Sequence, residues 1–516
     1  MSTFVLKCFL SITDHSQRHT PVMWRYSLSQ HSEPAGIPAV HCSVRQGKDM
    51  ASHRTCIICG APAKSNEHIF PAALGGRRTN RGIYCHEHNI GFGRLVTRLE
   101  TQLAMMNGAL EVRPDRKDKA KPYIFTDGDT RYRLIGADIQ IDMPPPLDKA
   151  QLKSGMEIQL AVPSLDVAQR WVEENQSDKI RIEIKQAGAA RTHYRTEGNR
   201  IRLEFGGCDF LQAVGYLALT FFAHSFPGAA RQEGLKPFKA MLQRELKNDK
   251  ANWQDELVWW DGRETSSVVG ANPHDFGHVL AVGICGTTAR AYAYVSFFSC
   301  LSFGVDLGPV EYDGELRTVC TFINPLAERA EDSVTVAQED AFNTEIGKPG
   351  ICLHDMMHSG GAVQAVGRFQ QKLHLRNAWK IVDAIMPRVP KQPSSEGLER
   401  FSEIARENGQ PLLNLLGVVV TGVAQGFTKY DHVQRALKKM VAKDETQHNG
   451  LAPEAWQALQ ESMKVIALAM HEFHLEGALE PKVVLSLFFG QPGIALITCK
   501  VVLPALLSLS PEESLA

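Results

Sequence analysis

The chain has 516 residues, a formal net charge of −1, 44% hydrophobic residues and 22% charged residues. This balance is that of a folded protein and excludes a mostly disordered chain. A stretch of about 18 uninterrupted apolar residues does not occur, so the sequence predicts no membrane span and no membrane partner. The length suggests three or four structural units. An odd number of cysteines, 11, and no secretory signal favour a reducing compartment, and we expect a cytoplasmic protein.

Positive charge is concentrated near the start of the chain. Residues 51–121 hold 12 Lys and Arg against 6 Asp and Glu, whereas residues 122–516 hold 39 against 48. A basic segment on an acidic body is typical of a localised polyanion-binding module. A solvated basic face has the same composition, so charge alone does not separate the two interpretations.

The first segments differ sharply in pattern. Residues 1–49 are rich in Ser, His, Gln and Pro without periodicity and predict a disordered tail, or an over-extended start, because Met50 directly precedes the first patterned segment. Residues 50–121 predict a compact module. Its last part is a helix, in which Phe92, Leu95, Val96, Leu99, Leu103 and Met106 form one apolar stripe.

From residue 122 onward, alternating and helical patterns mix. Alternating apolar residues predict strands over 156–162, 180–184, 201–205, 278–285 and 289–298. Apolar and amphipathic patterns predict helices over 210–222 and 238–246. We therefore expect a mixed α+β domain over 122–386. A Pro- and Ser-containing linker over 387–397 and a mostly helical region over 398–516 follow it.

The module carries closely spaced metal-type ligands. Cys56-Ile-Ile-Cys59 is followed after 25 residues by Cys85-His-Glu-His88. Two pairs, each separated by two residues, supply the four donors of a tetrahedral Zn²⁺ site. His86 is a competing fourth ligand, although its spacing does not suit a knuckle. In so short a segment, metal binding would supply much of the folding free energy, on the order of 10 kcal/mol.

Between the two pairs lies Glu67-His68-Ile-Phe-Pro71, followed by Leu74-Gly-Gly76 and three arginines. In an extended strand the side chains of Glu67 and His68 point to opposite faces, so one can bind a metal while the other faces a substrate. Guanidinium groups grip phosphate with two parallel hydrogen bonds. The arginines expected to contact nucleic acid are Arg77, Arg78, Arg81 and Arg94.

This ordered set, C-x-x-C, Glu-His-Ile-x-Pro-x-x-Leu-Gly-Gly, Asn and C-x-x-H-Asn, resembles the HNH endonuclease family in its zinc-knuckle, ββα-metal form. The resemblance covers about residues 54–100. It implies that this segment is a small ββα-metal module. Together with the mixed domain and the helical region predicted from the patterns that follow it, this gives an α+β protein.

The resemblance also implies roles. His68 would be the general base, and Asn80 would brace the loop that orients it. Glu67 and Asn89 would hold a catalytic divalent ion, Mg²⁺ or Mn²⁺. Cys56, Cys59, Cys85 and His88 would form a structural zinc site.

The implied function is hydrolysis of phosphodiester bonds in DNA, with RNA a less favoured substrate. A zinc-knuckle nucleic-acid-binding protein without catalysis is the first alternative. A nuclease gated by its C-terminal regions is the second, with residues 122–516 sensing a regulatory ligand or a protein partner.

Overall fold

The computed structural model describes residues 8–9, 54–115, 119–127, 130–136, 138–142, 169, 172–174, 176, 199–200, 206–244, 257–314, 318–327, 334–338, 361–392, 397–409 and 452–489. The chain divides into two compact units. The sheet unit comprises Met23–Tyr123 and Leu203–Lys372, and the helical unit comprises Met1–Val22, Ile124–Arg202 and Leu373–Ala516. The sheet unit thus combines the predicted 50–121 module with much of the predicted 122–386 domain.

Six antiparallel strands form the sheet of the sheet unit, in the order β13-β12-β9-β10-β11-β8. They are β8 (Val258–Asp261), β9 (His278–Cys285), β10 (Arg290–Phe297), β11 (Leu301–Pro309), β12 (Thr318–Ile323) and β13 (Val334–Gln338). The strands predicted over 278–285 and 289–298 are confirmed as β9 and β10. Apolar side chains run almost continuously along β9 because both faces of this strand are buried.

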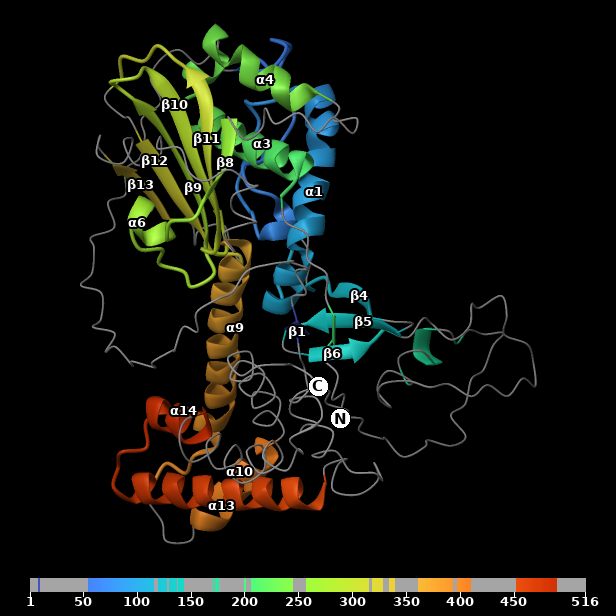
Figure 1. The fold of residues 1–516 in the computed structure, drawn as a ribbon, viewed down its shortest axis with the longest axis vertical. Coiled ribbons are helices and arrows are strands. Elements are labelled where there is room, and N and C mark those ends of the chain that lie inside the picture. Colours follow the sequence, from blue (N-terminus) through green and yellow to red (C-terminus); the bar gives the residue numbers. More distant parts are fainter. Residues whose placement is uncertain are drawn as a thin grey trace, which may run out of the picture. The chain divides into compact units, whose positions relative to one another are not determined.

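Helix α3 (Cys208–Ser225) covers one face of the sheet. Phe210 packs against Phe297 and Phe303, with ring centroids 6.1 and 5.5 Å away. On its other side α3 contacts α1 (His86–Leu110), so α3 lies between the sheet and α1 (Figure 1). The predicted apolar helix over 210–222 is confirmed as part of α3. The amphipathic helix predicted over 238–246 corresponds to α4 (Lys236–Gln243).

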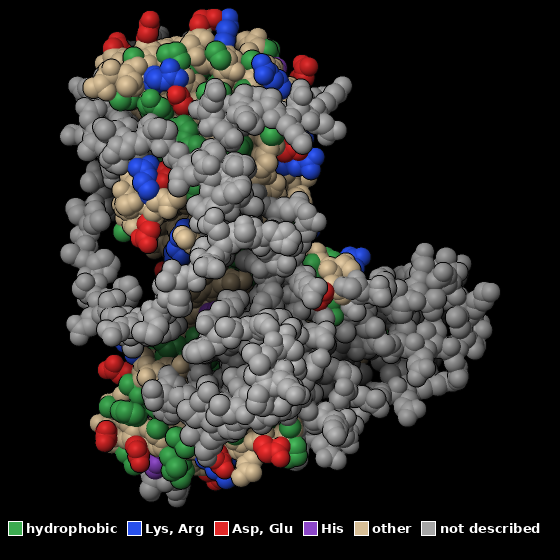
Figure 2. Space-filling view, viewed as in Figure 1, with side chains coloured by type: hydrophobic (Ala, Val, Ile, Leu, Met, Phe, Trp, Pro, Cys, Tyr) green, Lys and Arg blue, Asp and Glu red, His purple; other side chains and the backbone are tan. Residues whose placement is uncertain are grey.

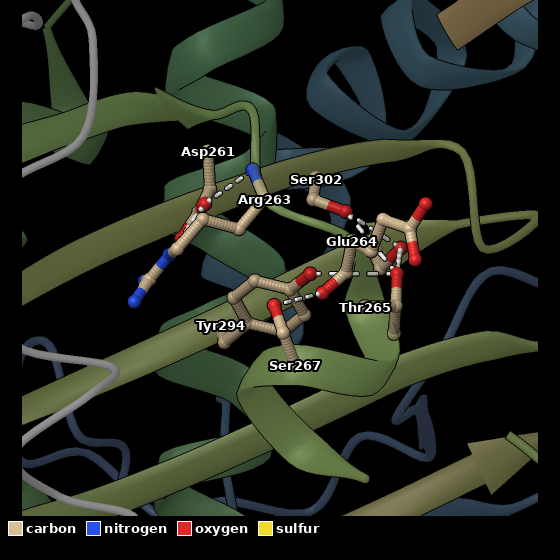
Figure 3. A network of polar contacts seen from close by, with 8 residues as sticks. Asp261, Arg263, Glu264, Thr265, Ser267, Tyr294 and Ser302 are labelled. Carbon is tan, nitrogen blue, oxygen red and sulfur yellow. Dashed lines mark hydrogen bonds and ion pairs between the residues drawn. The ribbon is translucent and has the colours of Figure 1, made fainter. Parts of the chain in front are cut away.

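The opposite face of the sheet carries α6 (Thr265–Val269), whose Val268 and Val269 pack on residues of β9, β10 and β12. Four buried hydroxyl groups meet beside this helix, from Thr265, Tyr294, Ser296 and Ser302, and they serve as partners for one another (Figure 3). Figure 3 also shows Arg263 gripping Asp261 at the end of β8. Buried polar groups need such partners, so the cluster is a satisfied part of the core.

The segment with the predicted ligands forms a short hairpin followed by a long helix. β2 (Glu67–His68) pairs antiparallel with β3 (Thr79–Asn80), the 3₁₀ turn η2 (Ala72–Leu74) lies between them, and α1 follows. The predicted stripe from Phe92 to Met106 is buried at five of its six positions, and Val96 is half-buried.

The loop between β2 and β3 is wedged against the sheet. The ring of Phe70 lies 4.6 Å from that of His278 on β9. Gly75 has φ +89°, and a Cβ atom there would lie 2.6 Å from the Cα of Pro325. A Cβ atom on Gly76 would lie 1.9 Å from the carbonyl oxygen of Phe70. Both glycines are therefore required by close backbone approach.

Two more 3₁₀ turns, η4 (Ala229–Arg231) and η5 (Glu233–Leu235), connect α3 to α4.

In the helical unit, β4 (Tyr123–Asp127), β5 (Thr130–Ile135) and β6 (Asp138–Ile141) form a three-stranded sheet. β1 (Cys8–Phe9) pairs in parallel with β7 (Asn199–Arg200). The sequence predicted no strand at Cys8–Phe9, and the remainder of the predicted 1–49 tail lies outside the described residues.

The described helices of the C-terminal region are α10 (Gly397–Glu407), α13 (Pro453–Leu475) and α14 (Pro481–Phe489). α9 (Gly361–Ile385) and the turn η7 (Met386–Arg388) precede them. Within the described part of 398–516 the predicted helical character is confirmed, and the overall mixed α+β class is confirmed as well. The strands predicted over 156–162, 180–184 and 201–205 lie outside the described residues. Among the described helices, none combines the length and apolar character that a bilayer crossing requires.

The close approach at Gly76 makes a stability prediction. We expect Gly76→Ala to lower the free energy of unfolding by about 2 kcal/mol or more, because the backbone of Phe70 must move to admit a methyl group. Gly91→Ala is the matched control, since nothing lies within 4 Å of its added Cβ. On the exposed side of α1 it should leave stability unchanged or raise it by up to about 1 kcal/mol. Thermal unfolding followed by near-UV circular dichroism measures the stability of both variants. Equal unfolding midpoints would contradict the close backbone contact between Gly76 and Phe70.

Candidate functional site

Four predicted ligands converge at the start of α1. Each of Cys56, Cys59, Cys85 and His88 offers one ligand atom, and these atoms all lie within 4.8 Å of one another. The Nδ1 atom of His88 is 3.1 Å from the Sγ atom of Cys85, and the sulfurs of Cys59 and Cys85 are 3.8 Å apart. Three sulfurs and one imidazole nitrogen are a donor set that suits zinc. The cluster could therefore hold a metal ion such as zinc.

The backbone around Cys56 favours the thiolate form that a metal ligand needs. Burial by itself raises the pKa of this thiol, but hydrogen bonds from the backbone at Cys59, Cys85 and Ile58 outweigh it, so the pKa lies below its ordinary value. A thiol that ionises readily binds a cation at a lower cost. The neighbouring Cys59 shifts the other way, because burial and the adjacent thiols of Cys56 and Cys85 raise its pKa.

Two residues that follow α3 in the chain, Arg231 and Gln243, make hydrogen bonds around the Cys/His cluster. The guanidinium group of Arg231 donates to the carbonyl oxygens of Thr55 and Gly82, at 2.5 and 2.7 Å, and so joins the two knuckles. The side-chain amide of Gln243 lies 3.0 Å from the Nε2 atom of His88. In the structure, the nitrogen of the Gln243 amide faces Nε2. If Nδ1 of His88 binds the metal, Nε2 carries the proton, and the amide must turn over so that its oxygen accepts that proton.

The hairpin brings the predicted hydrolytic residues together. In the register of β2 and β3, Glu67 lies opposite Asn80 and His68 lies opposite Thr79. Neighbouring strand residues face opposite ways, as expected from the sequence. Here Glu67 is turned into the protein, with 8% of its surface exposed, while the side chain of His68 is 28% exposed.

A carboxylate holds His68. The Nε2 atom of His68 lies 3.2 Å from Oδ2 of Asp115, and Nη1 of Arg77 lies 3.4 Å from Oδ1 of the same carboxylate. Partial burial works to raise the pKa of Asp115, but these two partners outweigh it and hold the pKa below its ordinary value. Asp115 is therefore charged at neutral pH and fixes the orientation of the imidazole.

Glu67 is held from the other side. The hydroxyl group of Tyr216 on α3 donates to its Oε1 atom. Burial raises the pKa of Glu67 to about 7, and the hydrogen bond from Tyr216 offsets only part of that effect. A buried carboxylate with one hydroxyl donor is a group whose charge a nearby cation would stabilise.

Asn80 and Asn89 occupy different surroundings. The side-chain oxygen of Asn80 accepts the N–H of Gly82 at 2.6 Å, and its nitrogen lies 2.8 Å from Nδ1 of His224. Asn89 lies in the first turns of α1 and is half-buried. Among the described residues, no hydrogen bond or ion pair joins Glu67 to His68 or to Asn89.

Of the four predicted arginines, Arg77 is half-buried and the other three are exposed. Arg77 is committed to internal partners, because it donates to the carbonyl oxygens of Arg113 and Ala327 as well as to Asp115. Arg94 donates to the carbonyl oxygen of Arg244 at 2.9 Å. Arg78 and Arg81, on either side of β3, have exposed side chains.

One face of the molecule shows mixed charge. On the described part of the face in Figure 2, Lys and Arg side chains are interspersed with Asp and Glu side chains. No broad basic patch stands out on that part of this face.

Three site residues escaped the sequence reasoning: Asp115, Tyr216 and His224. Asp115 follows α1 in a charged stretch that looks like an ordinary polar connection. Tyr216 and His224 lie in a strongly apolar helix interpreted as core. The only available signal was the spacing of the polar residues in that helix.

Aromatic and imidazole side chains outside the cluster belong to the core. Trp259 and Trp260 are buried in β8 and so offer no base-stacking surface. His474 contacts the carbonyl oxygen of Gln392 and packs on Phe401.

Comparison of this chain with protein-family models, curated proteins and solved structures found no match.

The neighbouring histidines of α1 allow a sharp test of the metal cluster. We expect the purified protein to hold one zinc ion and His88→Ala to lose it or bind it at least about tenfold more weakly, because one of four donors is removed. His86→Ala should keep the ion, since the exposed His86 is not among the converging ligands. Elemental analysis and competition with a chromogenic chelator measure both, and loss of zinc in His86→Ala alone would make His86 the fourth ligand.

Proposed function

We propose that this protein is a metal-dependent endonuclease of the HNH type that hydrolyses phosphodiester bonds in DNA. The observation that carries the proposal is the pairing on β2. His68 is partly exposed and oriented by Asp115, and the adjacent Glu67 is a buried carboxylate on the opposite face. The resemblance of the sequence between Cys56 and Asn89 to HNH endonucleases supports the same conclusion.

His68 is suited to act as the general base. A neutral imidazole that donates its Nε2–H to Asp115 keeps the lone pair on Nδ1, and that nitrogen can take a proton from an attacking water. The carboxylate of Asp115 then stabilises the imidazolium cation that forms, in the manner of the orienting acid in a catalytic triad. Asp115 is thus a positioning residue for His68.

Glu67 and Asn89 are the residues that would hold Mg²⁺ or Mn²⁺. A carboxylate and an amide oxygen are the hard donors that these ions prefer. The buried, hydrogen-bonded carboxylate of Glu67 fits a cation site. When bound, the ion would supply charge stabilisation for the phosphate and the leaving oxygen.

The remaining roles follow the chemistry of the residues. Zinc held by Cys56, Cys59, Cys85 and His88 would stabilise the start of α1 and hence the hairpin beside it. The exposed Arg78 and Arg81 are the favoured contacts for DNA phosphates, whereas Arg77 serves to hold Asp115.

Removal of the general base is the primary test. We expect His68→Ala to reduce Mg²⁺-dependent nicking of plasmid DNA by at least about 100-fold, because general-base help is worth roughly 10²–10⁴ in rate. His86→Ala should nick at the wild-type rate. Equal nicking by His68→Ala would remove His68 from the mechanism. DNA binding by the wild-type protein without cleavage in Mg²⁺ or Mn²⁺ would favour the non-catalytic alternative.

The orienting carboxylate gives a second test. We expect Asp115→Asn to lower the turnover number for nicking by at least about tenfold while leaving the KM for plasmid near its wild-type value, because His68 loses its fixed tautomer. Asp209→Asn is the matched control, since Asp209 pairs with Arg98 on the surface. A turnover number for Asp115→Asn equal to that of the control would show that Asp115 does not position the base.

A further inference from the structure

α3 carries an unusual polar stripe. Fourteen of its residues, from Phe210 to Ala223, are buried and mostly apolar. Gln212, Tyr216, Thr220 and His224 are spaced four residues apart, so they lie on one side of the helix. Gln212 donates to the carbonyl oxygens of Met241 and Leu242 near the end of α4. A polar residue inside a core costs free energy unless it has a partner.

The other three members of the stripe have their partners in the segment from β2 to Tyr84. Tyr216 donates to the carboxylate of Glu67. The hydroxyl group of Thr220 lies 3.0 Å from that of Tyr84, directly before the ligand Cys85. Nδ1 of His224 lies 2.8 Å from the amide nitrogen of Asn80.

The directions of these hydrogen bonds follow from the neighbouring donors. Thr220 donates its hydroxyl hydrogen to the carbonyl oxygen of Tyr216 at 2.8 Å, so it accepts the hydrogen of Tyr84. The oxygen of Asn80 accepts from Gly82, so its NH₂ group donates to Nδ1 of His224. The imidazole of His224 is therefore an acceptor toward the hairpin.

The polar stripe of α3 contacts β2 and β3 at two residues that are paired with each other. Glu67 and Asn80 are directly opposite each other in the register of β2 and β3. One is held by Tyr216 and the other by His224, two turns of the same helix apart. A rigid helix with tightly packed neighbours fixes such side chains more precisely than a loop does.

We propose that α3 is the positioning element of the hydrolytic site, with Tyr216 setting the carboxylate of Glu67 for a divalent cation and His224 setting Asn80, which is paired with Glu67 across the hairpin. This inference rests on the proposed endonuclease function and extends it to a part of the chain outside the HNH-like segment. Tyr216 and His224 are positioning residues, because neither would touch the substrate.

The proposed role of Tyr216 is tested by the affinity of the protein for a divalent cation, a measurement that requires no enzymatic turnover. Mn²⁺ binding to the zinc-loaded, full-length protein is measured by electron paramagnetic resonance. We expect Tyr216→Phe to weaken Mn²⁺ binding about 10- to 100-fold, the usual effect of removing a partner that orients a metal ligand. Tyr294→Phe is the matched control, because it removes a buried hydroxyl from the sheet core and should leave Mn²⁺ affinity unchanged.

Glu67→Gln separates the two proposals. If Glu67→Gln abolishes Mn²⁺ binding while Tyr216→Phe binds as the control does, the positioning role of Tyr216 is overturned and the cation site stands. If Glu67→Gln leaves Mn²⁺ affinity unchanged, the cation site of the proposed function is overturned instead.

The proposed role of His224 is tested by enzyme kinetics. This test does not depend on whether the Tyr216→Phe variant folds. We expect His224→Ala to lower the turnover number for nicking at least about tenfold with unchanged Mn²⁺ affinity, because Asn80 loses its acceptor while Glu67 keeps its donor. His224→Asn should recover most of the turnover, since its side-chain oxygen can accept near the position of Nδ1. Wild-type turnover in His224→Ala, or equal turnover in the His224→Ala and His224→Asn variants, would overturn the positioning role of His224.

Discussion

The packing of α3 between the sheet and α1 is the constraint on which the rest of the sheet unit depends. Its apolar residues fill the space over β9, β10 and β11, and burial of such side chains is the dominant favourable term in folding. The same packing brings Tyr216, Thr220 and His224 to the hairpin. Because the helix cannot shift without disturbing the sheet core, the polar contacts that it makes with Glu67, Tyr84 and Asn80 are held in place.

The metal cluster and the hairpin depend on this arrangement in different ways. The cluster is assembled from residues close in sequence, and Arg231 and Gln243 then close it from the segment that follows α3. The hairpin is only two residues long on each strand, so its own ladder contributes little. Its stability comes from the wedge of Phe70 against His278 and from side-chain partners on α3.

Under the proposed function, the two faces of β2 have separate supports. Asp115 and Arg77 hold His68 on the partly exposed side, and Tyr216 holds Glu67 on the buried side. The adjacent residues Glu67 and His68 therefore lie in different environments. Such a difference allows neighbouring titratable groups to take different roles. Arg77, one of the four arginines expected to contact nucleic acid, donates instead to Asp115 and to two carbonyl oxygens.

Local patterns in the sequence determined the ligand cluster, the opposite orientation of Glu67 and His68, the stripe of α1 and the strands β9 and β10, because each depends on spacing within one segment. Residues 210–222 were also recognisable as a buried helix, yet the role of the polar positions in and beside it was not. Only the tertiary structure decided that Tyr216 meets Glu67, that His224 meets Asn80 and that Asp115 returns to His68. These contacts join residues 149, 144 and 47 positions apart. Periodicity carries no information on such pairings, which arise only when separate elements pack into a common core.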